Sequence, residues 1–173
     1  MSLSSRGSLV LLAALLVLVS PLLAEKVPDK TLDGVKVGDW VEHRMVTAPE
    51  LQMQTTVKQT VTVVTADEVT VEHETSTTMS GKPLPPQKMA MKRPRFVEKP
   101  ADAPKQAEPP AAKGTEKIKA CDGKDYTCQV YEQTIAGKLS KSYLCSDIPL
   151  GGIVLSELDG KHVLELVGWG KGK

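Results

Sequence analysis

The feature that most constrains the fold of this chain is a two-residue alternation of apolar side chains. In the stretch 57–71, valines at positions 57, 61, 63, 69 and 71 all carry odd numbers, and threonines stand between several of them. Successive side chains of a β-strand point to opposite faces, so this pattern is typical of strands with one buried and one solvated face. The stretch therefore predicts a β-hairpin.

Two registers of this hairpin are compatible with its turn. A three-residue loop at Ala66-Asp67-Glu68 sets Val63 opposite Val71 and keeps the valines on one face. A two-residue turn sets Val63 opposite Thr70 and mixes valine with threonine on that face. We favour the three-residue loop, because a one-residue slip moves a strand's apolar side chains to the wrong face.

Asp-Gly dipeptides predict two further tight turns. Asp159-Gly160 lies between apolar segments and, as a two-residue turn, pairs Leu155 with Leu164 and Glu157 with His162. Asp122-Gly123 is the second such turn.

With strands also expected near residues 39–47 and 138–145, the chain reads as about seven strands joined in sequence. We predict an all-β, mainly antiparallel fold, either an open curved meander sheet or a partly closed half-barrel.

Residues 81–114 differ in composition from the rest. They contain eight prolines, six alanines, eight Lys or Arg and three acidic residues. Proline at this density excludes a central strand or a long helix, so we expect a long Pro-rich, extended and mobile loop that interrupts the domain. Its basic residues form a candidate docking site for an anionic partner, although a solvated insertion has the same pattern. They are Lys88, Lys92, Arg93 and Arg95.

The first 24 residues predict a cleavable signal peptide. Arg6 precedes an apolar run from Leu9 to Val19, and a Ser20-Pro21 break comes before charge begins at Glu25. The run is shorter than the roughly 20 residues that span a bilayer, which disfavours the alternative of an uncleaved anchor. We expect an exported protein, periplasmic or extracellular, in which residues 25–173 form a single β-rich domain.

Net charge bears on the class of partner. The chain has 22 Lys and Arg against 21 Asp and Glu, and removal of Arg6 with the signal peptide makes the two numbers equal. A balanced charge argues against nucleic-acid binding by the whole domain.

Three cysteines in an exported protein predict one disulfide and one remaining thiol. If Ala136-Gly137 is a two-residue turn, Val130 pairs with Tyr143 and Cys128 lies opposite Cys145. The rival pairing of Cys121 with Cys128 requires another register, since the simplest one sets Cys121 opposite Lys124. We favour the bond between Cys128 and Cys145 and keep the rival and free thiols open.

No pattern in the chain points to catalysis, a metal or a cofactor. A repeated Val-Glu-His contains His43 and His73, but neighbouring Glu and His side chains on a strand point to opposite faces. A metal site would require the two histidines on adjacent strands. Catalytic, phosphate-binding and dinucleotide-binding motifs are absent from the sequence.

Several short motifs resemble a loose group of uncharacterised exported proteins from bacterial envelopes. They are Val37-Gly38-Asp39-Trp40-Val41-Glu42, Cys128-Gln-Val-Tyr-Glu132, Ser146-Asp-Ile-Pro149, Gly151-Gly-Ile-Val154 and Glu165-Leu-Val-Gly168. That group is similar to the LolA/LppX-type half-barrel, a curved antiparallel sheet whose concave side holds an acyl chain or another apolar ligand. The resemblance implies the fold and transfers no functional residue.

These observations favour a non-enzymatic envelope protein that binds an envelope component or a protein partner through one face of its sheet. The partner classes left open are protein, polysaccharide and lipid. The resemblance adds a periplasmic carrier of a lipid or lipoprotein as the alternative, and an enzyme of unknown class ranks below both. An apolar cavity of several hundred Å³ would favour the carrier.

Overall fold

The computed structural model describes residues 25–46, 53–99 and 111–173. The predicted signal peptide at 1–24 lies outside these residues. The described residues form strands and one short 3-10 helix, η1. The elements are β1 (Glu25–Pro28), η1 (Lys30–Leu32), β2 (Trp40–Val46), β3 (Met53–Val64), β4 (Glu68–Met79), β5 (Lys82–Pro83), β6 (Gln87–Pro94), β7 (Phe96–Lys99), β8 (Gly114–Lys119), β9 (Asp125–Ile135), β10 (Lys138–Leu144), β11 (Ile153–Leu158) and β12 (Lys161–Gly170).

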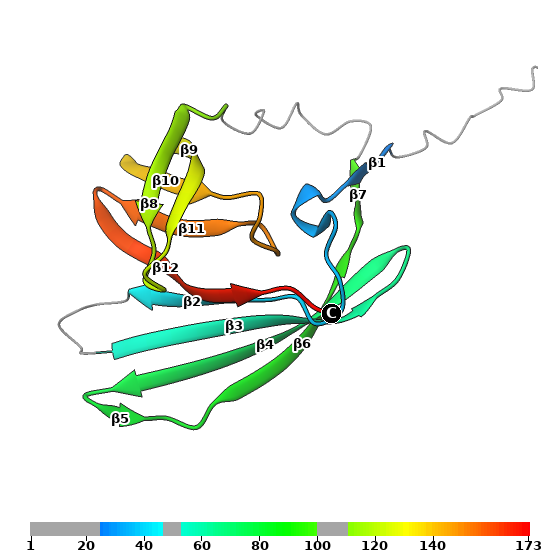
Figure 1. The fold of residues 1–173 in the computed structure, drawn as a ribbon, viewed down its shortest axis with the longest axis horizontal. Coiled ribbons are helices and arrows are strands. Elements are labelled where there is room, and N and C mark those ends of the chain that lie inside the picture. The colour runs from blue at the N-terminus through cyan, green and yellow to red at the C-terminus, as the bar shows by residue number, and fades with distance from the viewer. Residues whose placement is uncertain (1–24, 47–52, 100–110) are drawn as a thin grey trace, which may run out of the picture.

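One antiparallel sheet dominates the structure and confirms the all-β prediction. Its order is β5-β4-β3-β2-β12-β11-β10-β9-β8, and β6 also pairs with β4. Hairpins link most neighbours, while β12 returns to lie beside β2 and so joins the two ends of the chain. The sheet curves until β8 and β9 stand above β12 and β2, but it does not close into a barrel (Figure 1). A separate two-stranded sheet pairs β1 with β7.

The register predicted for the hairpin of β3 and β4 is wrong. Near the turn Val63 pairs with Thr70, which is the alternative that we disfavoured. Thr62 is then an extra residue on β3, and beyond this bulge Val61 pairs with Val71. A β-bulge changes the pairing by one residue within a strand, so the turn and the buried face follow different registers. Val61 and Val71 consequently both face the core, whereas Val63 is exposed.

A second bulge changes the hairpin of β11 and β12. Glu157 pairs with His162 as predicted, but beyond the bulge Ser156, rather than Leu155, lies opposite Leu164. The Asp122-Gly123 turn is also one residue wider than expected. Ala120, rather than Cys121, closes it on Lys124, with 3.0 Å between the Ala120 nitrogen and the Lys124 oxygen. The positions of these turns were therefore predictable, while the registers of these three hairpins were not.

The core lies inside the curve and draws on both halves of the sheet. Val41 and Leu166 come from β2 and β12, further valines come from β3 and β4, and other members, such as Val130 and Val154, come from β9, β10 and β11. Leu32, the last residue of η1, and Ile148, beyond β10, belong to the same cluster. Val41, Val69, Cys128 and Leu166 are completely buried. Burying one Leu or Val side chain contributes roughly 1.5–3 kcal/mol, so this cluster is the main source of cohesion.

Much of the Pro-rich stretch is strand rather than loop. β6 pairs with β4 from Gln87 to Pro94, and β5 and β7 flank it. Residues 100–110 lie outside the described residues. Within the described chain β6 pairs only with β4, so it is an edge strand, where a proline costs no ladder hydrogen bond on its open side. The exclusion of a central strand thus agrees with the structure, but the prediction of a loop at 87–94 is wrong.

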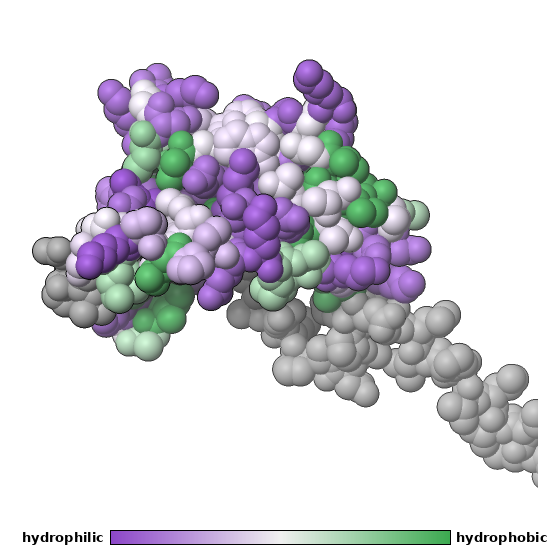
Figure 2. All heavy atoms as spheres, turned by 90° about the horizontal axis from the view of Figure 1, so that it is seen from below, coloured by the Kyte–Doolittle hydropathy of each residue, from purple (hydrophilic) through white to green (hydrophobic). Residues whose placement is uncertain are grey.

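The outer surface near this edge is mainly hydrophilic. Seen from below, apolar side chains form separate patches rather than one continuous surface (Figure 2). Exposed apolar side chains on β3 to β6 and their turns are Val63, Met79, Leu84, Met89 and Met91. In the part of the chain that the structure describes, no helix has the length and apolar character needed to cross a membrane.

Candidate functional site

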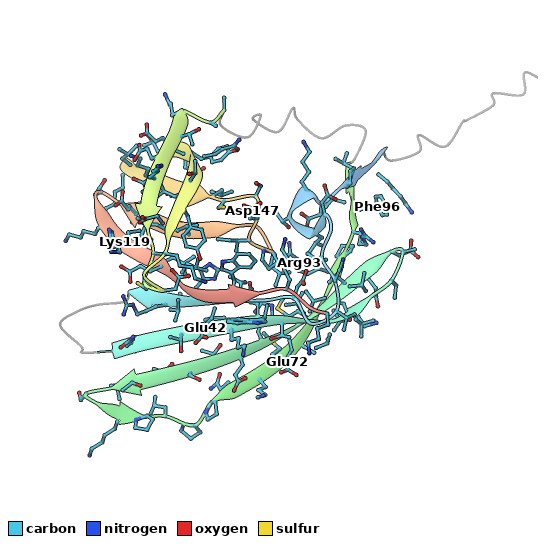
Figure 3. The ribbon with its side chains drawn as sticks, viewed as in Figure 1. Glu42, Glu72, Arg93, Phe96, Lys119 and Asp147 are labelled. Carbon is cyan, nitrogen blue, oxygen red and sulfur yellow. The ribbon has the colours of Figure 1, made fainter. Side chains whose placement is uncertain are left out.

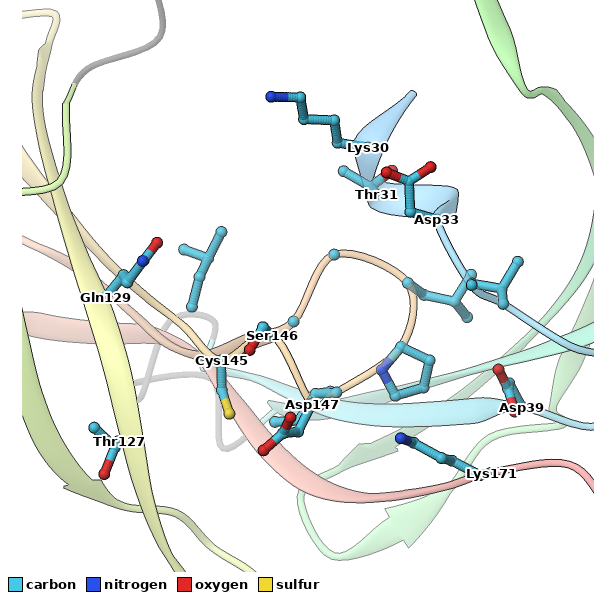
Figure 4. A pocket seen from close by; sticks show the side chains of 18 of the residues that line it. Lys30, Thr31, Asp33, Asp39, Thr127, Gln129, Cys145, Ser146, Asp147 and Lys171 are labelled. Carbon is cyan, nitrogen blue, oxygen red and sulfur yellow. The ribbon is translucent and has the colours of Figure 1, made fainter. Parts of the chain in front are cut away.

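An open cleft of about 860 Å³ lies between the upper half of the sheet and the N-terminal segment. The loop that joins β10 to β11 runs along it, η1 lies on the opposite side, and β8 and β9 contribute a third group of side chains (Figure 4). Lys171, just after β12, also lines the cleft. Four separate parts of the chain therefore meet at this site.

The loop 145–152 owes its shape to a closed base and two apolar anchors. The Cys145 nitrogen donates to the Gly152 oxygen at 2.7 Å, which brings the two ends of the loop together. Ile148 and Leu150 between them are buried in the core. Gly152 has a φ of +68°, and a Cβ there would lie 2.3 Å from the Cys145 oxygen. Only glycine fits this close approach at position 152. Gly151 and Gly152 also line the cleft.

On the opposite side of the cleft, two carboxylates accept hydrogen bonds from backbone nitrogens. Asp29 accepts a hydrogen bond from the Thr31 nitrogen at 3.0 Å and so caps η1. Asp39 is buried, and its two oxygens accept from the nitrogens of Lys36 at 2.8 Å and Gly172 at 2.7 Å. Asp39 thereby fastens the C-terminal end of β12 to the N-terminal segment.

The cleft has a mixed lining of polar and apolar side chains. Its hydroxyl and amide groups belong to Thr31, Thr115, Thr127, Gln129, Tyr131 and Ser146. Its charged groups are of both signs and belong to Lys30, Asp33, Asp39, Asp147 and Lys171. These groups offer hydrogen-bond donors and acceptors to a ligand. Apolar side chains line the same cleft, and they belong to Val35, Leu144, Ile148, Pro149 and Leu150.

The four candidate docking residues all have partners within the chain. Lys88 lies 3.2 Å from Glu74, and Lys92 lies 2.8 Å from Glu68. Arg93 points away from β6 toward η1 (Figure 3), where it contacts Asp29 at 3.0 Å and the Thr31 hydroxyl at 2.7 Å.

Arg95 donates to the Thr65 oxygen at 3.3 Å. The first three positive charges are thus compensated by carboxylates of the protein itself, and the fourth is engaged by a backbone carbonyl.

A compact group of ionisable side chains lies on β12 and β2 and in the turn between β8 and β9. Glu165 accepts hydrogen bonds from Arg44 Nε at 2.9 Å, from His162 Nδ1 at 2.7 Å and from the Cys121 thiol at 3.2 Å. Burial alone favours the neutral acid, but these hydrogen bonds lower the pKa of Glu165 to about 2.

The same group makes Cys121 a poor nucleophile. Burial, followed by its contact with Glu165, raises the pKa of the Cys121 thiol. A protonated thiol that donates to a carboxylate is not an activated one. The group therefore stabilises the pairing of β2 with β12.

The two histidines of the repeated motif do not meet. His43 lies on β2 and His73 on β4, and β3 separates the two strands. His43 Nε2 donates to the Ile153 oxygen at 2.8 Å, and His73 lies 3.3 Å from the Gln59 amide nitrogen. Among the described residues no group of three or more His, Cys, Asp or Glu could hold a metal ion.

Buried His43 should make stability fall in mild acid. Burial lowers its pKa below 6.5, although the bond to Ile153 opposes this shift. The unfolded chain then binds the proton more readily, so this contribution is fully present above about pH 6.5 and is lost as pH falls through the folded pKa.

We expect the urea midpoint to decrease between pH 7.5 and 5.5 in the wild type. The decrease should be smaller in His43→Gln, whose amide can donate to the same carbonyl. An equal decrease in both proteins would contradict the assignment.

The register that brings Cys128 toward Cys145 is confirmed as far as the strand continues. Val130 pairs with Tyr143, and Gln129 pairs with Leu144. Cys145 then leaves β10 to close the base of the loop, and both cysteines are buried as free thiols. The structure contains no disulfide among the described residues, and the bond remains a prediction.

Only part of this cleft has a local signal in the sequence. Pro149 and Gly151-Gly152 are typical of a loop, but the partners supplied by η1 and Lys171 depend on long-range packing. Fold and site together define a curved, open antiparallel sheet with a cleft of mixed polar and apolar lining. No protein-family model matches the chain, and no curated protein matches it.

Proposed function

We propose that this is a non-enzymatic, exported binding protein of the bacterial cell envelope that holds a polar envelope component or a polar segment of a protein partner in its cleft. The observation that carries the proposal is the cleft of about 860 Å³ with its hydroxyl, amide and charged lining. Its volume is in the range of ligand sites in proteins. The signal-peptide pattern supports export.

The construction of the cleft also supports binding. The loop 145–152 is anchored by buried Ile148 and Leu150, and Asp39 fixes the opposite side through two backbone nitrogens. Walls that are ordered before a ligand arrives lower the entropic cost of binding. Exposed Ser146 and Asp147 at the loop are then available for contacts with a ligand.

The lipid carrier remains the second candidate. The open curved sheet supports it, because a half-barrel offers a concave side for an acyl chain. In this protein, however, the apolar side chains on the concave side pack against one another, because Val41 and Leu166 are completely buried. The cleft beside them has apolar as well as polar walls, and its hydroxyl, amide and charged groups support a ligand that carries polar groups.

A charge reversal in the cleft should remove a bound ligand. We expect wild-type protein purified from its own host to carry a discrete adduct in native mass spectrometry, and Asp147→Arg to lose most of it. Asp67→Arg makes the same charge change at the exposed turn of β3 and β4 and should keep the adduct. A lipid adduct would support the carrier instead, and a bare mass for the wild type would contradict both binding proposals.

A further inference from the structure

The two buried cysteines lie at a junction between the core and the cleft. Cys128 is on β9 and is completely buried, while Cys145 is 7% exposed and also lines the cleft. Figure 4 shows Cys145 at the start of the loop, beside Ser146 and Asp147. Both cysteines belong to one core cluster.

The pairing of β9 with β10 directs these two residues toward each other. Every pair from Lys138 with Ile135 to Leu144 with Gln129 follows a single register without a shift. One more step in that register would place Cys145 opposite Cys128. Directly opposed residues on antiparallel strands have Cα atoms roughly 4.5–5.5 Å apart, a separation that a disulfide can span.

Cys145 lies one residue beyond Leu144, the last paired residue of β10, and it is not at disulfide distance from Cys128. Its backbone nitrogen donates instead to the Gly152 oxygen. A bond to Cys128 therefore requires Cys145 to follow β10 for one further residue. The base of the loop would move with it, because Cys145 and Gly152 are joined.

We propose that Cys128 and Cys145 are a redox pair whose disulfide locks the cleft-lining loop 145–152 onto β9. The structure corresponds to the reduced form. In an exported protein the thiols meet disulfide oxidants, of which oxidised glutathione is a suitable probe.

The exchange proceeds in two balanced steps. Cys145 lines the cleft, so its thiolate attacks oxidised glutathione, forms a mixed disulfide and expels one glutathione thiolate. The Cys128 thiolate then attacks Cys145 Sγ and expels the second. Two protein thiols are oxidised, one glutathione disulfide is reduced to two thiols, and the two protons pass to the departing glutathiones. Burial, with a contribution from Cys145, raises the pKa of Cys128 to about 11, so we expect the second step to be the slower one at neutral pH.

Trypsin separates the three cysteines, which makes the test decisive. Cleavage after lysine places Cys121 in peptide 120–124, Cys128 in peptide 125–138 and Cys145 in peptide 142–161. The full chain is incubated with oxidised or reduced glutathione, remaining thiols are alkylated, and the peptides are mapped without reduction. We expect peptides 125–138 and 142–161 to be joined and Cys121 to be alkylated.

Locking should also change stability and local dynamics. The bond closes a segment of about 17 residues, and a loop of that length predicts a rise in Tm of roughly 5–10 °C. Backbone amides of residues 146–152 should exchange more slowly in the oxidised protein. Cys121→Ser is the matched control and should retain the cross-link, the Tm shift and the slower exchange.

Loss of the cross-link in Cys145→Ala, with Cys128 then open to alkylation after unfolding, completes the expected result. A cross-link that contains peptide 120–124 would overturn the proposal. So would three alkylated cysteines in a wild-type chain that has been unfolded and refolded with oxidised glutathione. Neither result depends on whether the cleft binds a ligand.

Discussion

Replacing Gly152 by alanine should destabilise the protein by about 4 kcal/mol and lower its Tm by about 10 °C. The added Cβ would lie 2.3 Å from the Cys145 oxygen, and the φ of +68° is a conformation that alanine adopts only at a cost of about 1–2 kcal/mol. The contact is with backbone, so the base of the loop must open. Buried Ile148 and Leu150 then lose their packing.

Gly160→Ala is the matched control for this prediction. Its φ of +71° is nearly the same, but a Cβ there meets nothing within 4 Å. It should cost about 1 kcal/mol, the conformational penalty alone. Comparing the Tm values of the two variants separates the cost of the positive φ from the cost of the contact with the Cys145 oxygen. Equal Tm values would show that the closed base of the loop contributes little to stability.

Acid should lower the free energy of unfolding, because Glu165 becomes protonated. Hydrogen bonds from Arg44, His162 and Cys121 outweigh burial and lower its pKa from 4.5 to about 2. A carboxyl with a depressed folded pKa contributes stability that is present above the unfolded value and is lost as pH falls through the folded one. The side chain is only 14% exposed, so we expect a loss of about 3 kcal/mol between about pH 4.5 and 2.

The variant Glu165→Gln tests the assignment. It should be less stable than the wild type at pH 7 and should show a flatter dependence on pH below 4.5, measured by urea unfolding. Asp67→Asn removes a carboxylate at an exposed turn and should leave both quantities nearly unchanged. If Glu165→Gln kept the full acid dependence, another carboxyl would have to cause it.

The fold class was predictable because alternation and Asp-Gly turns are local signals. Each depends on residues that are neighbours in sequence, and the positions of the Asp159-Gly160 and Ala136-Gly137 turns agree with the structure. Bulges have no comparable local signal in this chain. Thr62 becomes the extra residue because Val61 and Val71 must both reach the core, which is a requirement of packing.

The prediction of a loop at β6 was wrong because it rested on composition alone. Pro86 precedes the strand and Pro94 ends it without interrupting its pairing, and its two lysines meet glutamates of β4. The sequence showed a concentration of positive charge, while the neutralising partners lie about 20 residues away in the chain. The cleft was likewise out of reach, because η1, the loop 145–152 and Lys171 meet only after the sheet has curved.

The bulges have one consequence for how this protein can change. In the hairpins of β3 with β4 and β11 with β12, a register shift separates the turn from the buried part of each pair. A residue gained or lost at the exposed tip can be absorbed at such a shift without moving the valines and leucines of the core. The tips themselves are tied to neighbouring segments, since the Arg95 nitrogen donates to the Asp67 oxygen and Asp159 bonds to Leu139. A change of length that keeps these bonds is therefore the kind that the fold can accept at little cost.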